Sequence, residues 1–187
     1  MNRIVSRLFV PIVAVLALLG VMSPASAATD PYCGITWGSQ VKEAGRMIHG
    51  PITELRAGRH ACFDRLVVDV GGPASTVVGY RVEYVDRVTH DGSGAYIPLR
   101  GAADLKIAVL TPGHNELGRP TYEPANPVEA VNVAGFSTFR QVAWGGTFEN
   151  QSLIGLGVRA RLPFRVFVLP GSWSNGVRVV VDVAHHW

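Results

Sequence analysis

The chain has 187 residues, of which 48% are hydrophobic and 17% are charged, with 17 Lys and Arg against 14 Asp and Glu. Arg3 and Arg7 lie in an N-terminal segment that we expect to be removed, which leaves 15 basic against 14 acidic residues, a formal charge of +1. This near balance gives no support to nucleic-acid binding. The remaining chain of about 160 residues is long enough for one domain with a hydrophobic core and too short for two comfortable ones.

Residues 1–27 have the three parts of a cleavable secretory signal peptide. Arg3 and Arg7 supply the positive charge, residues 8–22 form an uncharged apolar run, and residues 25–27 (Ala-Ser-Ala) offer the small side chains of a cleavage site. The apolar run is shorter than the roughly 20 residues of a membrane-spanning helix. We therefore predict a secreted protein of the cell envelope that begins near Ala28 and has no membrane span after cleavage. An uncleaved membrane anchor is the alternative.

Residues 28–57 have weak patterning, and we interpret them as an N-terminal extension. An even number of cysteines in an oxidising compartment favours a disulfide, here between Cys33 and Cys62. This bond would tie the extension to the sheet beside Trp37, and without it the whole extension should fray. Two free buried thiols are the alternative. A short helix is also expected at Ser39–Met47, where apolar residues have near-helical spacing.

Alternation of apolar and polar residues with period two dominates from residue 63 onward. It predicts strands, with one face of each on a core, around residues 65–70, 78–84, 105–109, 154–158, 164–168 and 177–183. Glycine- and proline-rich turns separate these segments, and residues 112–127 form a long irregular excursion. The pattern predicts an all-β fold, a single antiparallel β-sandwich over residues 58–187.

One string occurs twice, near the start and at the end of the predicted sheet region. Arg65-Leu-Val-Val-Asp-Val70 matches Arg178-Val-Val-Val-Asp-Val183. Two interpretations stay open: convergence on a composition that suits strands, or two strands in related positions of a pseudo-symmetric sandwich. In the second interpretation both strands bury valines and direct Arg and Asp outward.

An ordered set of short strings carries a resemblance to a known family. The set consists of Gly58-Arg-His-Ala-Cys-Phe-Asp-Arg-Leu-Val-Val-Asp-Val70, Gly79-Tyr-Arg-Val-Glu-Tyr-Val85, Asp91-Gly-Ser-Gly94, Gly101-Ala-Ala-Asp-Leu105, Phe148-Glu149, Gly155-Leu-Gly157, Pro163-Phe-Arg-Val166 and Arg178-Val-Val-Val-Asp-Val183. In this order the strings resemble the AMIN-like domain of exported actinobacterial proteins, which is named for its likeness to the AMIN domain of cell-wall amidases. AMIN domains are β-sandwiches that bind peptidoglycan, while the amidase chemistry resides in a separate domain. The resemblance therefore implies a binding module, and it supplies no catalytic residue.

The candidate binding residues are Arg140, Trp144 and Trp173. Sugar rings stack on aromatic faces, and carboxylates of peptide stems suit arginine forks. Arg140 and Trp144 precede a Gly-Gly turn, and Trp173 lies in a loop just before the last strand. A packing role for Trp144 in the core or at the sandwich edge is the competing interpretation.

We find no catalytic or metal-binding signature in the sequence. Ser93 beside His90 and Asp91 is typical of a hairpin turn, and the carboxylates at 64, 69 and 149 are typical of solvated strand residues. His185 and His186 follow a strand, where neighbouring side chains point to opposite faces and do not form a zinc site. We predict no metal, no cofactor and no enzymatic activity.

The leading hypothesis is an exported, non-catalytic cell-envelope binding module whose partner is a cell-wall glycan, with peptidoglycan first, or an envelope protein. One alternative is a small envelope hydrolase with an unrecognised carboxylate or Ser/His site. The other is a protein-interaction module that pairs through an edge strand of the sandwich.

Overall fold

The computed structural model describes residues 31–73, 77–171 and 176–187. The predicted signal peptide at residues 1–27 lies outside the described residues. Within these ranges no helix is long and apolar enough to cross a membrane.

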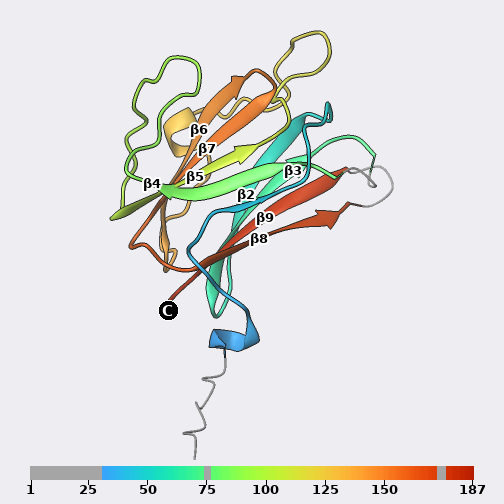
Figure 1. The fold of residues 1–187 in the computed structure, drawn as a ribbon. Coiled ribbons are helices and arrows are strands. Elements are labelled where there is room, and N and C mark those ends of the chain that lie inside the picture. Colours follow the sequence, from blue (N-terminus) through green and yellow to red (C-terminus); the bar gives the residue numbers. More distant parts are fainter. Residues whose placement is uncertain (1–30, 74–76, 172–175) are drawn as a thin grey trace, which may run out of the picture.

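Two antiparallel sheets face each other in a β-sandwich (Figure 1). The five-stranded sheet has the order β1 (Lys42–Ala44), β4 (Tyr80–Val85), β5 (Ala103–Val109), β7 (Gln151–Val158) and β6 (Phe139–Phe148). The four-stranded sheet has the order β2 (Ile52–Arg59), β3 (Phe63–Val70), β9 (Val177–Ala184) and β8 (Phe164–Pro170). Two short 3-10 helices, η1 (Tyr32–Gly34) and η2 (Pro127–Glu129), are the remaining elements. The predicted all-β sandwich is confirmed.

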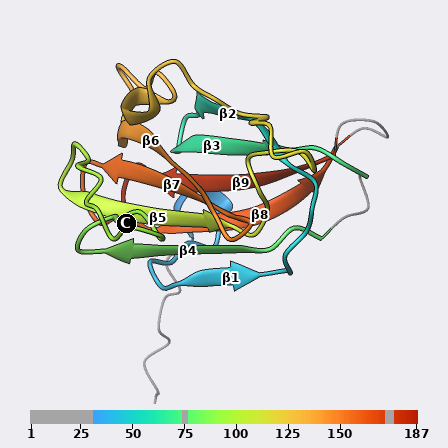
Figure 2. The same cartoon turned by 90° about the horizontal axis from the view of Figure 1, so that it is seen from above.

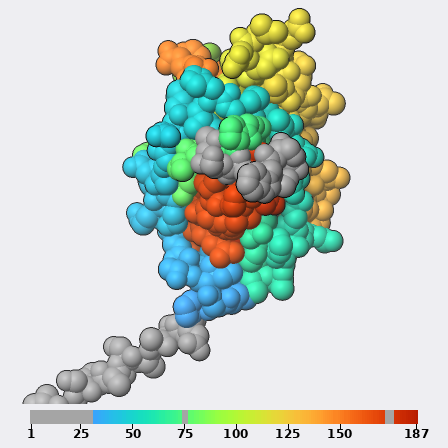
Figure 3. Space-filling view, turned by 90° about the vertical axis from the view of Figure 1, so that its right-hand side faces the viewer, coloured from blue at the N-terminus to red at the C-terminus, as the bar shows by residue number. Residues whose placement is uncertain are grey.

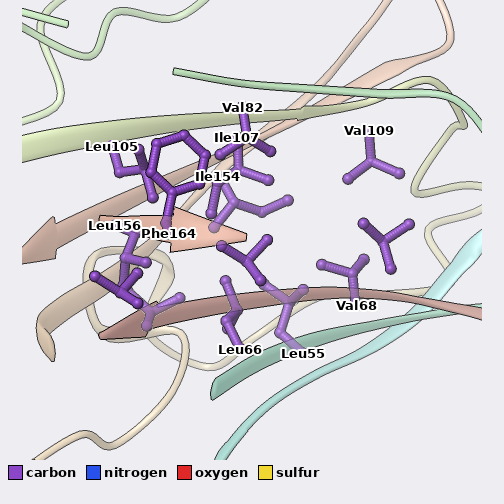
Figure 4. Close-up of a cluster of buried hydrophobic side chains, with 14 of the residues drawn as sticks. Leu55, Leu66, Val68, Val82, Leu105, Ile107, Val109, Ile154, Leu156 and Phe164 are labelled. Carbon is purple, nitrogen blue, oxygen red and sulfur yellow. The ribbon is translucent and has the colours of Figure 1, made fainter. Parts of the chain in front are cut away.

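The core lies between the two sheets because alternate residues of each strand point inward. Apolar side chains from both sheets meet there with no exposed surface or almost none (Figure 4), among them Leu66, Val68, Val82, Leu105, Ile107, Ile154, Leu156, Phe164, Val179 and Val181. Burial of apolar surface on this scale contributes more to the stability of such a fold than any other favourable interaction.

The repeated string places β3 and β9 next to each other. The two strands are antiparallel, so the string runs in opposite directions in them and each Arg faces the Asp of the other copy: Arg65 opposes Asp182, and Asp69 opposes Arg178. This arrangement agrees with our second interpretation, in which the two strands occupy related positions in one sandwich. It differs in one respect, because the Asp182 side chain is fully buried and is not exposed to solvent. Paired opposite charges on one face of a sheet favour this register over a slipped one.

The outer face of the five-stranded sheet is covered by its own chain. Residues 86–102, between β4 and β5, place Val88 and Ile97 against Leu153 to form a second apolar cluster. Glycines in β7 make room for this loop, since a Cβ on Gly157 would lie 2.0 Å from the carbonyl oxygen of Arg100. The loop covers part of the outer face of this sheet, and the outer face of the four-stranded sheet carries a groove, described below.

The segment before residue 58 is part of the sandwich. The boundary predicted at residue 58 falls inside β2, which pairs with β3 along its whole length, while β1 lies beside β4 (Figure 2). The helix expected at Ser39–Met47 is wrong. Gly45 has φ +76°, and a Cβ there would lie 2.5 Å from the carbonyl oxygen of Val78, so the chain runs extended and close against the start of β4.

Candidate functional site

The predicted disulfide between Cys33 and Cys62 is present, with the two Cα atoms 6.4 Å apart. It attaches η1 to the loop between β2 and β3 at the lower end of the sandwich (Figure 1). Beyond it, the Phe164 N–H donates to the Gly38 carbonyl at 2.8 Å, so the segment also pairs with the start of β8. Figure 3 looks onto this side, where the blue N-terminal segment lies below the orange-red surface of β8. The disulfide is compatible with an oxidising, extracytoplasmic compartment.

A row of three charges crosses the four-stranded sheet on its outer face. Arg65 of β3 and Arg165 of β8 both bond the buried carboxylate of Asp182 in β9, at 2.6 and 2.8 Å. Hydrogen bonds to that carboxylate raise the pKa of Arg65, which keeps the guanidinium group charged. Two charges against one carboxylate leave the row with positive charge facing solvent.

Aromatic rings support the two guanidinium groups of this row. The Arg65 guanidinium lies 5.1 Å from the ring centre of Phe63 and 5.4 Å from that of Phe167. The Arg165 guanidinium lies 5.3 and 5.0 Å from the same two rings, and 5.6 Å from the ring of Trp37. Cation–π contacts of this kind hold the side chains in one orientation. The positive charges are therefore preorganised.

Two further arginines lie in the next rows of the sheet. Arg56 of β2 bonds Asp69 at 2.5 and 3.0 Å. Because Asp69 is engaged with Arg56, Arg178 opposite it has no carboxylate partner among the described residues, and its Nη2 donates to the Pro170 carbonyl. We call this surface the basic face; it carries Arg56, Arg65, Arg165 and Arg178, against the acidic residues Glu54, Asp69 and Asp182.

A groove of about 290 Å³ runs across the basic face. We call it the arginine groove; Arg56, Arg65, Arg178, His60 and Leu169 surround it, and Val67 and Val180 also line it. Gly58 opposes Arg65 at its edge, where the missing side chain leaves space. The Nε atom of Arg178 is buried and has no hydrogen-bond partner within the described ranges. Because buried donors are nearly always paired, this unpaired Nε distinguishes Arg178 from Arg56 and Arg65, whose Nε atoms bond carboxylates.

A second hollow lies at the lower end of the same sheet, beside the disulfide. We call it the aromatic cleft; it has a volume of about 660 Å³ and is lined by Pro31, Tyr32, Ile35, Trp37, Pro163 and Trp187, together with Thr36. The Trp187 side chain is 72% exposed. Arg165, which contacts Trp37, connects the aromatic cleft with the basic face.

Two of the three predicted binding residues, Arg140 and Trp144, lie outside both hollows. Arg140 donates to the carbonyl groups of Phe136, Ser137 and Phe139, so its guanidinium group closes the turn before β6. Trp144 is half-buried and packs edge-on against Tyr122 at 5.1 Å, next to the main core. Trp173 lies outside the described residues. A binding role for these three residues stays a prediction.

Two of the three carboxylates considered for catalysis, Asp64 and Asp69, have structural partners. Asp64 is fully buried and accepts hydrogen bonds from the Thr138 and Phe139 N–H groups, at 2.5 and 3.1 Å, and one from His185 Nε2 at 3.2 Å. It thereby fastens the start of β6, in one sheet, to β3 in the other. Glu149 lies in the turn between β6 and β7 with φ +48°.

The Ser93 group is likewise engaged in turn contacts. Ser93 Oγ accepts from the Ala95 N–H, His90 Nδ1 contacts the Gly145 carbonyl, and Asp91 bonds Lys106 at 2.7 Å. In the part of the chain that the structure describes, no group of three or more His, Cys, Asp or Glu side chains is placed to hold a metal ion.

Sequence reasoning missed Arg56, His60 and Arg178 as site residues, although Arg178 lies in the repeated string. Arg65 and Arg165 share the carboxylate of Asp182. Sequence reasoning placed Trp37 beside the disulfide and gave no role to Trp187.

Comparison with known proteins agrees with the fold. The family model described as the AMIN-like domain matches residues 50–185. No curated protein and no solved structure matches the chain. The match covers most of the chain, including every strand of the four-stranded sheet and both copies of the repeated string. The chain therefore belongs to the AMIN-like domain family.

Proposed function

We propose that the protein is an exported, non-catalytic module that binds the bacterial cell wall, with peptidoglycan as its partner, and that the basic face is the contact surface. Membership of the AMIN-like family supports the cell-wall role. We choose the basic face as the contact surface because the Nε atom of Arg178 is buried and has no hydrogen-bond partner among the described residues. Arg178 lines the arginine groove together with two other arginines, Arg56 and Arg65.

The chemistry of the arginine groove suits a carboxylate. A guanidinium group donates two parallel hydrogen bonds to a carboxylate, and such charge-assisted bonds are stronger than neutral ones. A buried N–H group without an acceptor costs about 1–3 kcal/mol. A ligand carboxylate that reaches Arg178 would remove this cost, and the peptide stems of peptidoglycan carry carboxylates.

Cosedimentation with purified, insoluble peptidoglycan tests the proposal. The mature protein should appear in the pellet. Loss of a hydrogen bond to a charged group costs about 1.5–3 kcal/mol, so we expect R178Q to weaken binding roughly tenfold or more. The matched control is R119Q, which removes the same charge from the exposed loop between β5 and β6.

Three results decide the outcome. Weakening by R178Q with unchanged binding of R119Q supports the basic face as the contact surface. Equal weakening by both variants would mean that net charge alone drives binding, which contradicts the groove. Recovery of the wild-type protein entirely in the supernatant would contradict peptidoglycan binding itself.

Export is a separate part of the proposal and has its own test. The N-terminal sequence of residues 1–27 and the disulfide support it. The mass of the protein recovered outside the cytoplasm should correspond to a chain that begins near Ala28. A mass that retains residues 1–27 would contradict cleavage.

A further inference from the structure

The aromatic cleft is distinct from the arginine groove, and its aromatic residues lie outside the part of the chain that the family model matches. Tyr32, Trp37 and Trp187 are all outside residues 50–185, whereas Pro163 is within them. The cleft is closed on one side by η1 and the segment that follows it, and on the other by Pro163 and Trp187.

The indole rings of the cleft are held in place through their N–H groups. Trp37 Nε1 donates to the Tyr32 carbonyl at 2.8 Å, and Trp187 Nε1 donates to the Arg161 carbonyl at 3.3 Å. Both polar atoms of the two indoles are thus engaged with the protein. What remains for a ligand is the ring surface, and the 72% exposure of Trp187 leaves a large part of it in water.

We propose that the aromatic cleft binds a sugar ring of a glycan strand by stacking on Trp187 and Trp37. A pyranose ring has an apolar C–H face that suits an aromatic surface and hydroxyl groups around its edge that need polar partners. The cleft offers the Thr36 hydroxyl, which forms no hydrogen bond with other described residues, and the Arg165 guanidinium lies next to the cleft, 5.6 Å from the ring centre of Trp37. A wholly apolar ligand would leave the Thr36 hydroxyl without a partner.

Continuity with the basic face favours a sugar over a proline-rich peptide, which also docks on aromatic grooves. Arg165 contacts Trp37 in the cleft and Phe63 and Phe167 on the basic face, so the two surfaces are contiguous. Peptidoglycan presents a sugar and a carboxylate-bearing peptide in the same repeating unit. The identity of the sugar therefore rests on the proposed function, whereas binding at the cleft is testable without it.

The disulfide assembles this site. Tyr32 and Trp37 belong to the segment that Cys33 attaches to Cys62, whereas the arginines of the arginine groove come from strands of the sheet. Reduction should release the segment and open the aromatic cleft while the arginine groove persists. Sugar binding is then sensitive to reductant, and binding of carboxylates at the groove is not.

The test is titration of the protein with a soluble β-1,4-linked N-acetylglucosamine tetramer, followed by NMR. W187A removes an exposed ring, so it should leave the fold intact, and we expect roughly tenfold weaker binding. The matched control is F148A, which removes another exposed aromatic ring, 48% exposed, from the end of β6. Its affinity for the tetramer should be unchanged. Reductant should weaken binding to the wild-type protein as W187A does.

The outcomes separate this inference from the proposed function. If insoluble peptidoglycan binds the protein but the tetramer does not, the cleft inference is overturned and the proposed function stands. Equal affinity of W187A and the wild type, or binding of a polyproline peptide in place of the tetramer, also overturns it. If neither the tetramer nor peptidoglycan binds, both proposals fail. Binding of the tetramer that W187A and reductant weaken, and F148A does not, supports the cleft.

Discussion

Removal of the Cys33–Cys62 disulfide, by the double substitution C33S/C62S, should lower the stability of the protein by a predictable amount. The bond joins residues 29 positions apart. In the chain-entropy model, closing a loop of that length stabilises the folded state by about 3.6 kcal/mol at room temperature. For urea unfolding with a slope near 2 kcal/mol/M, this corresponds to a midpoint roughly 2 M lower.

The structure also limits where the chain should loosen. Sequence patterning alone predicts that residues 28–57 fray without the bond, but β1 and β2 are hydrogen-bonded into the two sheets, and Ile52 is fully buried. Only the segment from η1 to Gly38 depends on the disulfide and a few local contacts. Protease cuts in C33S/C62S should therefore fall before β1, while β2 stays protected.

Urea denaturation followed by circular dichroism measures the first effect, and limited proteolysis with mass spectrometry measures the second. Reductant should shift the midpoint of the wild-type protein and leave that of C33S/C62S unchanged. An unchanged midpoint in the double variant would refute the loop-entropy reasoning. Cuts within β2 would show that sheet pairing does not hold this part of the chain.

Substitutions at three further positions test the interior. D64A leaves the buried N–H groups of Thr138 and Phe139 without an acceptor, so the free energy of unfolding should fall by about 2–6 kcal/mol. D64N keeps an amide oxygen there, so its free energy of unfolding should fall clearly less in the same denaturation assay. G157A forces a Cβ to within 2.0 Å of the Arg100 carbonyl and should lower the melting temperature by several degrees; a wild-type melting temperature would show that the loop over β7 can move aside. Burial raises the pKa of Tyr84 from 10.0 to about 12, so the stability that its neutral form contributes is fully present below pH 10 and is lost as the pH rises towards 12. In a titration followed by tyrosinate absorbance, alkaline unfolding should coincide with the last rise in absorbance. Y84F should remove that last rise. An unaltered titration curve in Y84F would assign the last rise to another tyrosine.

Local pattern was sufficient for most of the strands, because period-two alternation is a property of neighbouring residues, but it predicted no strand at β1, β2 or β6. β3, β5, β7, β8 and β9 lie where the alternation places them. It failed at residues 39–47, where apolar spacing suggested a helix and three residues pair with β4 instead. A strand as short as β1 has too little pattern of its own, and its pairing partner decides its conformation.

The candidate site was less accessible to sequence reasoning. Arg140 and Trp144 have the residue types of a binding site, but contacts with the turn before β6 and with Tyr122 engage them. Arg178 has the sequence pattern of one half of a balanced charge pair. Asp69, which lies opposite Arg178 in the pairing of β3 with β9, bonds Arg56 instead. No local pattern indicates which of the two arginines Asp69 will bond.

The sequence by itself determined the strand content, the disulfide and the family. Strand content follows from local alternation, and the chain has only two cysteines to pair. Tertiary structure decided which surface is open. Residues 86–102 cover part of one sheet, while the other sheet brings together side chains as far apart in the chain as Arg65 and Asp182, 117 positions, and leaves Arg65 at the edge of a groove. Contacts at such separations depend on the register of strands and on the course of loops, and both are set by packing of the whole domain.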